Sequence, residues 1–273
     1  LDADTFTSPE SYEVALLAAG AALQAVEHVM APPSVAEPLR AALALVRPPG
    51  HHAERDEAMG FCLFNNAAVA AAHARTLGAR RVAIVDYDVH HGNGTQHIFE
   101  ADAHVLYAST HQSPYYPGTG EVHEVGTGDG TGFTVNLPLA VGAVDEDYRL
   151  VFDEVLLPVL RQFHPDLLIV SAGFDAHERD PLAGMRVTTA GYGAMTMALR
   201  AVAEECCQGR LVVLTEGGYD LEAIGACLEA VVETLTTPEA TVAWPPSTAV
   251  PPVRGRQASE AARAALHPFW RLE

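Results

Sequence analysis

Residues 82–94 read VAIVDYDVHHGNG, and this stretch decides how the chain is expected to fold. The apolar run at 82–85 predicts a strand buried in a parallel sheet, and the polar residues after it predict a binding site at the strand's carboxyl end. Side chains alternate between faces in an extended chain, so Asp86, Asp88 and His90 are expected to point the same way. Two carboxylates and an imidazole on one face indicate a bound cation, and a hydrogen-bonded polar strand end is the alternative.

Similar apolar runs recur along the chain and alternate with Ala- and Leu-rich helical stretches. This alternation is typical of β-α units that build a parallel sheet. We therefore predict a three-layer α/β/α fold with a mostly parallel central sheet. The expected strands are 41–46, 81–86, 105–108, 167–171 and 211–214, with 134–137 as a shorter sixth candidate. The expected helices are 11–30, 65–77, 145–163, 188–206 and 221–235.

The length of 273 residues suits one large α/β domain, and we expect a single domain over residues 1–273. Beyond residue 236 the sequence is Pro-rich through residue 253, and a short Ala-rich helix is expected at 257–266. We interpret residues 237–273 as a tail that docks back on the domain.

The composition bears on which partners the protein can bind and on where in the cell it is expected. The net charge is −19 and every basic residue is Arg, which disfavours nucleic acid and mildly favours cationic substrates, although acidity also serves solubility alone. No stretch comes near the roughly 20 apolar residues that span a bilayer, and residues 1–9 lack the features of a secretory signal. We expect no membrane partner and a cytoplasmic location. The 4 cysteines form no CxxC pair, so disulfides and a cysteine-built zinc site are not expected.

Zinc suits the ligands after the strand at 81–86, because it accepts Asp oxygen and His nitrogen. A catalytic zinc site takes three protein ligands and leaves one position for water. Asp175, in the segment SAGFDAH at 171–177, also follows an apolar strand and is a candidate to complete the coordination sphere. On its own, an Asp after a Gly and a Phe is more often a turn or cap residue.

Two further clusters could supply catalytic groups. His51 and His52 follow the segment RPPG, and imidazoles suit general acid–base work near neutral pH, although a histidine pair in a loop is often only solvated surface. Tyr219 follows two glycines that allow a sharp backbone bend, and its phenol could donate a hydrogen bond to a developing oxyanion. A core tyrosine beside a tight turn is the alternative.

Five motifs in order resemble the histone deacetylase superfamily, specifically its bacterial class II-like members and the related acetylpolyamine amidohydrolases. They lie between Arg47 and Leu221 and agree in order, spacing and neighbours. The motifs are RPPGHHAERDEAMGFC (47–62), VDYDVHHGNGTQ (85–96), ASTHQSPYYPGTGE (108–121), SAGFDAHERDPLAG (171–184) and LTEGGYDL (214–221).

The resemblance implies roles for the catalytic groups. It makes His52 the general base and then the general acid, and it makes Tyr219 the oxyanion donor. It pairs His51 with Asp86. Asn93 takes the position where some classes place an Asp beside the second histidine, so His52 is expected to lack a carboxylate partner.

The resemblance also implies two metal ions. It makes Asp88, His90 and Asp175 the ligands of a catalytic Zn²⁺, with Fe²⁺ as the alternative metal. A structural K⁺ ion is expected near the catalytic metal. Backbone oxygens around Asp86, Asp88 and His90, with Ser109 and Thr110, would enclose this ion.

In the same comparison, Gly60 and Phe61 match one wall of the family's substrate tunnel and Tyr116 matches the opposing aromatic. Leu182 stands where polyamine-selective relatives carry an acidic residue. We therefore expect N-acetyl-lysine in a protein or peptide as substrate, with an acetylpolyamine or another small acylated amine as the alternative. The oligomeric state stays open.

Two rival functions and one departure from the family pattern remain. An arginase-like enzyme of the same fold would need further Asp ligands for two Mn²⁺ ions, and position 91 is His. A catalytically silent acyl-lysine binder is the non-enzymatic rival. Family members normally carry about 90 further residues before the position that matches Leu1, so we expect an N-terminally truncated chain. If no natural extension exists, one sheet edge and its apolar face are expected to be exposed.

Overall fold

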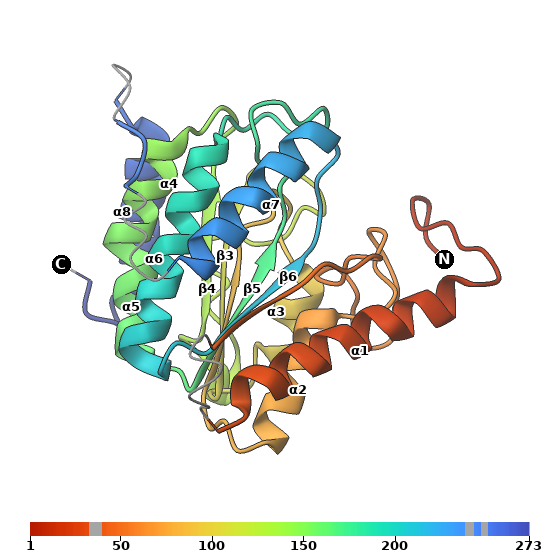
Figure 1. Cartoon of the computed structure of the whole chain (residues 1–273). Helices are drawn as coiled ribbons and strands as arrows, with labels where there is room; N and C mark the ends of the chain where they lie inside the picture. The colour runs from red at the N-terminus through yellow and green to blue at the C-terminus, as the bar shows by residue number, and fades with distance from the viewer. Residues whose placement is uncertain (33–39, 238–242, 247–250, 273) are drawn as a thin grey trace.

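A six-stranded sheet, parallel throughout, lies at the centre of the molecule (Figure 1). The computed structural model describes residues 1–32, 40–237, 243–246 and 251–272. The strand order is β1-β6-β5-β2-β3-β4. The strands are β1 Ala41–Ala44, β2 Val82–Asp86, β3 Val105–Gln112, β4 Thr134–Leu139, β5 Leu167–Ala172 and β6 Leu211–Thr215. All six predicted strands are therefore present.

Helices cover both faces of the sheet, which confirms the predicted three layers. One face carries α1 Ser11–Met30, α2 Asn66–Thr76 and α3 Asn93–Phe99. The other face carries α4 Asp145–Val151, α5 Leu157–Phe163, α6 Thr189–Cys207, α7 Leu221–Thr236 and α8 Val253–Leu266. A π-helical turn, Phe152–Leu156, joins α4 to α5, so the helix predicted at 145–163 is continuous but irregular.

The sheet separates two hydrophobic cores, because side chains alternate along each buried strand. Ala83 and Val85 of β2 pack in the core under α4–α8, whereas Val82 and Ile84 pack in the core under α1 and α2. Burial on both faces explains why these strands read as continuous apolar runs.

Several predicted boundaries differ from the structure, and one helix was not predicted. β1 ends at Ala44 and not at 46, and β4 continues to Leu139. β3 continues to Gln112, so Ser109 lies within the strand and not after it. Helix α3 was not expected, since its segment is poor in strong helix formers, and it packs against β3. Helix α8 begins at Val253 and not at 257, because its Gly255 N–H donates to Asp147 Oδ1 at 2.8 Å and ties the first turn to α4.

Helix α8 packs against α4 and β4, as expected for a tail that docks back on the domain. The remainder of the predicted Pro-rich tail lies partly outside the described residues, which leave out 238–242 and 247–250.

Helix α1 corrects the expectation that no stretch is apolar enough to span a bilayer. By length and composition alone, Ser11–Met30 could cross a membrane. Here its buried side packs against α2 and β1, while Tyr12, Leu16 and Leu17 are exposed.

The strand order places the functional residues at one crevice. From β2 the chain moves outward through β3 to β4, and it then returns to β5 on the other side of β2 before reaching β6. The direction of winding thus reverses between β2 and β5. Ligands of open α/β sheets bind at the carboxyl ends of strands at such a reversal.

Candidate active site

Three potential metal donors meet at the carboxyl ends of β2 and β5. Asp88 and His90 follow β2, Asp175 follows β5, and their donor atoms all lie within 4.8 Å of one another. Nδ1 of His90 lies 3.0 Å from Oδ1 of Asp88 and 3.1 Å from Oδ2 of Asp175. The fold therefore brings together the three residues that were expected to bind a metal.

The chemistry of this group fits a divalent cation. Both carboxylates are fully buried, and Oδ2 of Asp175 accepts no hydrogen bond from any described residue, despite its proximity to His90. Burial raises the pKa of Asp175, and the negative charge of Asp88 raises it further. Burial also opposes ionisation of Asp88, but the imidazoles of His51 and His90 lower its pKa overall. Two carboxylates and one imidazole are a ligand set that Zn²⁺ accepts.

The backbone between Asp86 and His90 is bent and not extended. The prediction that Asp86, Asp88 and His90 point the same way because side chains alternate along a strand is therefore wrong. Strand β2 ends at Asp86, and a series of bends follows. The N–H of Asp88 donates to Oδ1 of Asp86 at 3.1 Å, and the N–H of His90 donates to Oδ1 of Asp88 at 2.8 Å. These local hydrogen bonds turn Asp88 and His90 to the metal group, while Asp86 contacts His51.

Backbone N–H groups from neighbouring segments hold the two carboxylates. The N–H of Gly217, after β6, donates to Oδ2 of Asp88 at 2.8 Å, and the N–H of Val89 donates to Oδ1 of Asp175 at 2.9 Å. A Cβ atom on Gly217 would lie 2.3 Å from Oδ2 of Asp175 and 2.7 Å from Oδ2 of Asp88. Position 217 therefore requires glycine for lack of space.

We expect Gly217→Ala to weaken Zn²⁺ binding by about 10- to 100-fold, the loss typical when a group that supports a metal ligand is changed. The added methyl group must displace at least one carboxylate. Gly225→Ala on α7 is the matched control, because a Cβ there meets nothing within 4 Å. Zinc titration against a competing chelator measures both affinities. Equal affinities for the two variants would contradict the steric argument.

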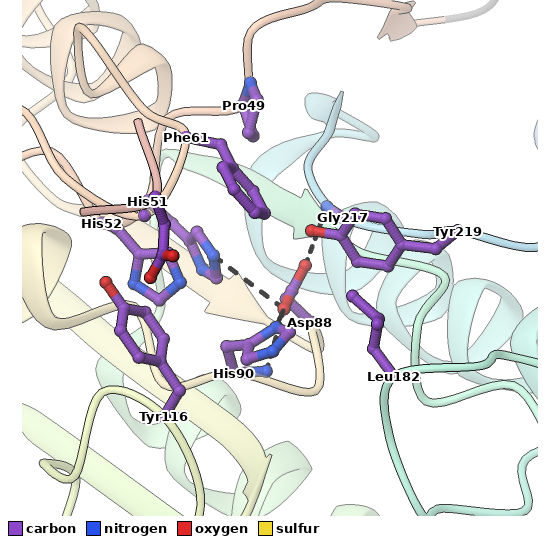
Figure 2. A pocket seen from close by; sticks show the side chains of 12 residues that line it. Pro49, His51, His52, Phe61, Asp88, His90, Tyr116, Leu182, Gly217 and Tyr219 are labelled. Atoms are coloured by element: carbon purple, nitrogen blue, oxygen red, sulfur yellow. Dashed lines mark hydrogen bonds and ion pairs between the residues drawn. The ribbon is translucent and has the colours of Figure 1, made fainter. Parts of the chain in front are cut away.

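The two histidines of the loop after β1 lie side by side under the pocket (Figure 2). Their ring centroids are 4.0 Å apart. Nδ1 of His51 lies 3.0 Å from Oδ2 of Asp86, and Nδ1 of His52 lies 2.7 Å from Oδ1 of Asn93. Each imidazole therefore has the partner that the family resemblance gave it.

Their surroundings push the two pKa values apart. Burial opposes a charge on His51, but the carboxylates of Asp86 and Asp88 raise its pKa well above the usual value. Burial lowers the pKa of His52 far below the usual value, and the charge of His51 lowers it further. His52 is thus neutral and able to accept a proton, whereas His51 is held protonated.

Tyr219 approaches the metal group from the loop after β6, and its hydroxyl points into the pocket near Asp88 (Figure 2). Oδ2 of Asp180 accepts the Tyr219 N–H at 2.8 Å, while Oδ1 of Asp180 accepts the Leu182 N–H at 2.9 Å. Burial raises the pKa of Tyr219, and the charges of Asp88 and Asp175 add to the rise. The phenol therefore stays protonated as a hydrogen-bond donor.

A pocket of about 230 Å³ opens above these groups, and the four predicted tunnel residues line it. Phe61 and Tyr116 are partly exposed at its mouth, and Leu182 lies near Tyr219. Gly60 packs directly against the His52 side chain, because a Cβ there would lie 2.5 Å and 2.7 Å from two ring atoms and 2.9 Å from the Cβ of His52. The walls are thus aromatic and apolar, which suits the methylene stem of an acylated amine.

Hydrogen bonds from distant segments fix the pocket walls. Phe61 has a φ of 69°, a left-handed conformation that is strained for a bulky residue, and its N–H donates to Oγ1 of Thr5 at 3.0 Å. Across the pocket, the hydroxyl of Tyr115 donates to the carbonyl of Leu182, while the Tyr115 ring stacks on His90. The Tyr115 hydroxyl therefore ties the segment that carries Leu182 to the ring that stacks on His90.

Comparisons with known proteins agree with this geometry. A histone deacetylase domain model matches residues 1–235. The chain belongs to the histone deacetylase family. It is 47% identical over 223 residues to histone deacetylase 10, chloroplastic, of Oryza sativa subsp. japonica, covering 81% of this chain and 50% of the relative. A probable deacetylase of Archaeoglobus fulgidus is 45% identical over 222 residues, which cover 81% of this chain and 60% of the relative.

The chain thus spans about half the length of the histone deacetylases that it matches. Among solved structures, the crystal structure of the HDA15 HD domain aligns with a TM-score of 0.88 at 42% identity. That alignment covers 98% of this chain and 72% of the other chain. Family and fold are therefore established by sequence and by structure.

The histone deacetylase resemblance assigned a K⁺ ion to residues that lie beside the metal group. Asp86 of β2 is paired in register with Ser109 of β3, and Thr110 follows in the same strand. Oγ1 of Thr110 is buried without a hydrogen-bond partner among the described residues, which leaves this oxygen free to bind a cation. The K⁺ site stays a prediction.

His91 of this histone deacetylase motif lies in a separate buried cluster. Its Nδ1 lies 2.8 Å from Oγ1 of Thr119, its Nε2 lies 3.0 Å from Oε1 of Gln96, and its ring neighbours His111. His91 therefore adds no ligand to the metal group. Within the part of the chain that the structure describes, Asp88, His90 and Asp175 form the one candidate metal group, which disfavours a two-metal arginase-like site.

Glu216 is a site residue that the sequence did not single out. Its buried carboxylate accepts N–H groups of Gly50 at 2.6 Å and His51 at 3.2 Å, and the Ser171 hydroxyl at 2.8 Å. Burial raises its pKa to about 7, although His51 opposes the rise. Glu216 thus anchors the histidine loop to β5 and β6.

We expect Glu216→Ala to lower the free energy of unfolding by about 2–4 kcal/mol, because two buried N–H groups lose their acceptor. Glu216→Gln is the matched variant. It keeps an acceptor for the N–H groups and can donate to Ser171, so its loss should be below about 1 kcal/mol. Urea unfolding of the metal-free proteins measures both. If both variants lost the same free energy of unfolding, Glu216 would stabilise the fold through its charge and not through its hydrogen bonds.

Proposed function

We propose that this chain is a metal-dependent deacetylase that hydrolyses the acetyl amide of N-acetyl-lysine in a protein or peptide. The observation that carries the proposal is the three-donor group at the base of an aromatic pocket, with a neutral imidazole beside a protonated one. Zn²⁺ fits the donor set best, and Fe²⁺ is the alternative.

A bound Zn²⁺ would supply Lewis-acid polarisation of the acetyl carbonyl and would lower the pKa of water. The protein residues carry the proton transfers. His52 accepts a proton from the attacking water as its oxygen bonds to the carbonyl carbon, and the Tyr219 hydroxyl donates a hydrogen bond to the oxyanion that develops. His52 then gives its proton to the amine nitrogen as the C–N bond breaks, which releases acetate and a free amine.

The fixed charge of His51 supports this cycle. It lies 4.0 Å from His52 between ring centroids and keeps His52 neutral until the water proton is transferred. His51 in turn depends on Asp86, which also accepts the Tyr107 hydroxyl at 3.1 Å.

For the substrate, we favour acetyl-lysine over acetylpolyamines because Leu182 gives the pocket an apolar side chain at the position where polyamine-selective relatives carry an acidic residue. The test is competition between an acetyl-lysine peptide and acetylspermidine, with acetate release and bound metal measured on the same preparation. A strong preference for acetylspermidine would reverse the substrate ranking.

The same assay separates catalysis from mere binding. A zinc-loaded protein that binds the peptide without releasing acetate would be the acyl-lysine binder that the sequence left open. Neutral His52 and protonated Tyr219 favour the enzyme, because a binder has no need of a proton acceptor and an oxyanion donor beside its metal.

A further inference from the structure

A second carboxylate stands behind the partner of His52. Oδ1 of Asn93 lies 2.7 Å from Nδ1 of His52, and Nδ2 of Asn93 donates to Oε1 of Glu54 at 2.6 Å. His52 and Asn93 are buried, and the side chain of Glu54 is 19% exposed. His52 therefore lacks a carboxylate in direct contact, as the sequence predicted, but one lies a single hydrogen bond further away.

The position of Glu54 is fixed from two sides. Asn93 and His97 lie four residues apart on α3, so they share a face of the helix, and Oε1 of Glu54 also lies 2.8 Å from Nδ1 of His97. The Glu54 N–H donates to the carbonyl of Glu57 at 2.8 Å, which closes a turn in the loop. A Cβ on Gly94 would lie 2.2 Å from the carbonyl oxygen of Ala53, so the loop and the start of α3 are in close contact.

These contacts determine which end of the Asn93 amide faces His52. Nδ2 has three acceptors around it: Oε1 of Glu54 at 2.6 Å, the carbonyl of His52 at 3.4 Å and Sδ of Met59 at 3.4 Å. If the amide were reversed, its oxygen would face a carboxylate and two further acceptors. Glu54 thus keeps Oδ1 towards His52.

The amide orientation in turn sets the tautomer of His52. With Oδ1 opposite, Nδ1 of His52 must carry the hydrogen, and Nε2 keeps the lone pair. No described residue hydrogen-bonds Nε2, and the ring lines the pocket. A reversed amide would place a donor at Nδ1 and move the hydrogen to Nε2, where it would block proton acceptance.

We propose that Glu54 is a positioning residue: through Asn93 it holds His52 in the tautomer whose free Nε2 faces the pocket. The inference rests on the proposed role of His52 as general base. The carboxylate also strengthens the Asn93 amide as an acceptor when His52 gains a proton, since charge polarises a chain of hydrogen bonds.

The test compares Glu54→Gln with wild type in the zinc-loaded protein. A glutamine amide accepts from Asn93 in one orientation and donates to it in the other, so both orientations of Asn93 become available. We expect kcat to fall about 10-fold with KM unchanged, the effect of one charge-assisted hydrogen bond that matters most in the transition state. In the Asn93→Ala background, Glu54→Gln should cause no further loss.

The spectroscopic readout is the tautomer of His52 by ¹⁵N NMR, assigned by comparison with His52→Ala. We expect a single Nδ1–H tautomer in wild type and a mixture in Glu54→Gln. Glu57→Gln removes an exposed charge from the same loop and is the matched control, expected to match wild type in both readouts.

A single His52 tautomer in Glu54→Gln overturns the proposal, and so does an unchanged kcat in an active protein. Failure of the proposed function is distinguishable from both results. If zinc-loaded wild type releases no acetate, the deacetylase assignment fails, while the comparison of tautomers still decides the role of Glu54.

Discussion

Tyr219→Phe should lower kcat for an acetyl-lysine peptide by about 10²- to 10³-fold, the typical cost of losing one oxyanion donor. The hydroxyl points into the pocket near Asp88, and the Asp180 carboxylate holds the Tyr219 backbone. Phenylalanine keeps the ring and its edge contact with Phe61, whose centroid is 6.3 Å away. Substrate binding should therefore change less than turnover.

Tyr116→Phe is the matched control for that experiment, because it removes a hydroxyl from the same pocket without removing a ring. Its kcat should stay within about twofold of wild type, since the ring keeps its edge contact with His52. Burial and the charges of Asp2 and Asp4, and not those of the metal group, raise the pKa of the hydroxyl that is removed. Bound zinc should be equal in all three proteins. Near-normal turnover of Tyr219→Phe with full metal content would remove Tyr219 from the mechanism.

Asp175→Asn should abolish tight Zn²⁺ binding and lower kcat by about 10³-fold or more. A catalytic metal stabilises the transition state by several kcal/mol, and each loss of about 1.4 kcal/mol slows the reaction tenfold. The variant also loses a negative charge from a buried group in which Asp88 and Asp175 repel each other. Metal content per chain and acetate release are the direct measurements.

Thermal unfolding gives a second test of Asp175. Zinc in 100-fold excess over its Kd should stabilise wild type by about 2.7 kcal/mol, because only the folded state holds the three donors together. The same zinc should leave Asp175→Asn nearly unchanged. Asp147→Asn alters another buried Asp, which accepts the backbone N–H groups of Val144 and Gly255 and is not one of the three metal donors, so it should keep the zinc effect. Equal zinc effects in both variants would exclude Asp175 as a ligand.

Those parts of the site whose function depends on residue type could be predicted from the sequence. Asp88 and His90 were predicted as metal ligands because carboxylates and an imidazole cluster directly after an apolar strand, whereas Asp175 joined them mainly through the family resemblance, and the structure brings all three together. The parallel sheet followed from the apolar runs, which are buried on both faces. The argument from an extended chain was wrong in detail, since hydrogen bonds to the carboxylates of Asp86 and Asp88 bend the backbone after β2.

Supporting residues could not be predicted, because their roles depend on contacts made only in the folded chain. Glu216 and Glu54 look like ordinary acidic residues in the sequence, yet one anchors the histidine loop and the other contacts the partner of His52. Thr5 gave no signal of its contact with Phe61. The cytoplasmic location and the K⁺ ion stay predictions of the sequence.

The two strands that carry the metal donors are partners in the sheet, but the chain completes β3, β4, α4 and α5 between them. A nascent chain on the ribosome therefore exposes Asp88 and His90 long before Asp175 has been synthesised. No fragment that ends earlier can assemble the complete site. A metal ion held by all three donors would therefore show that β5 has been made and has inserted beside β2, and zinc uptake during refolding would time that non-local step.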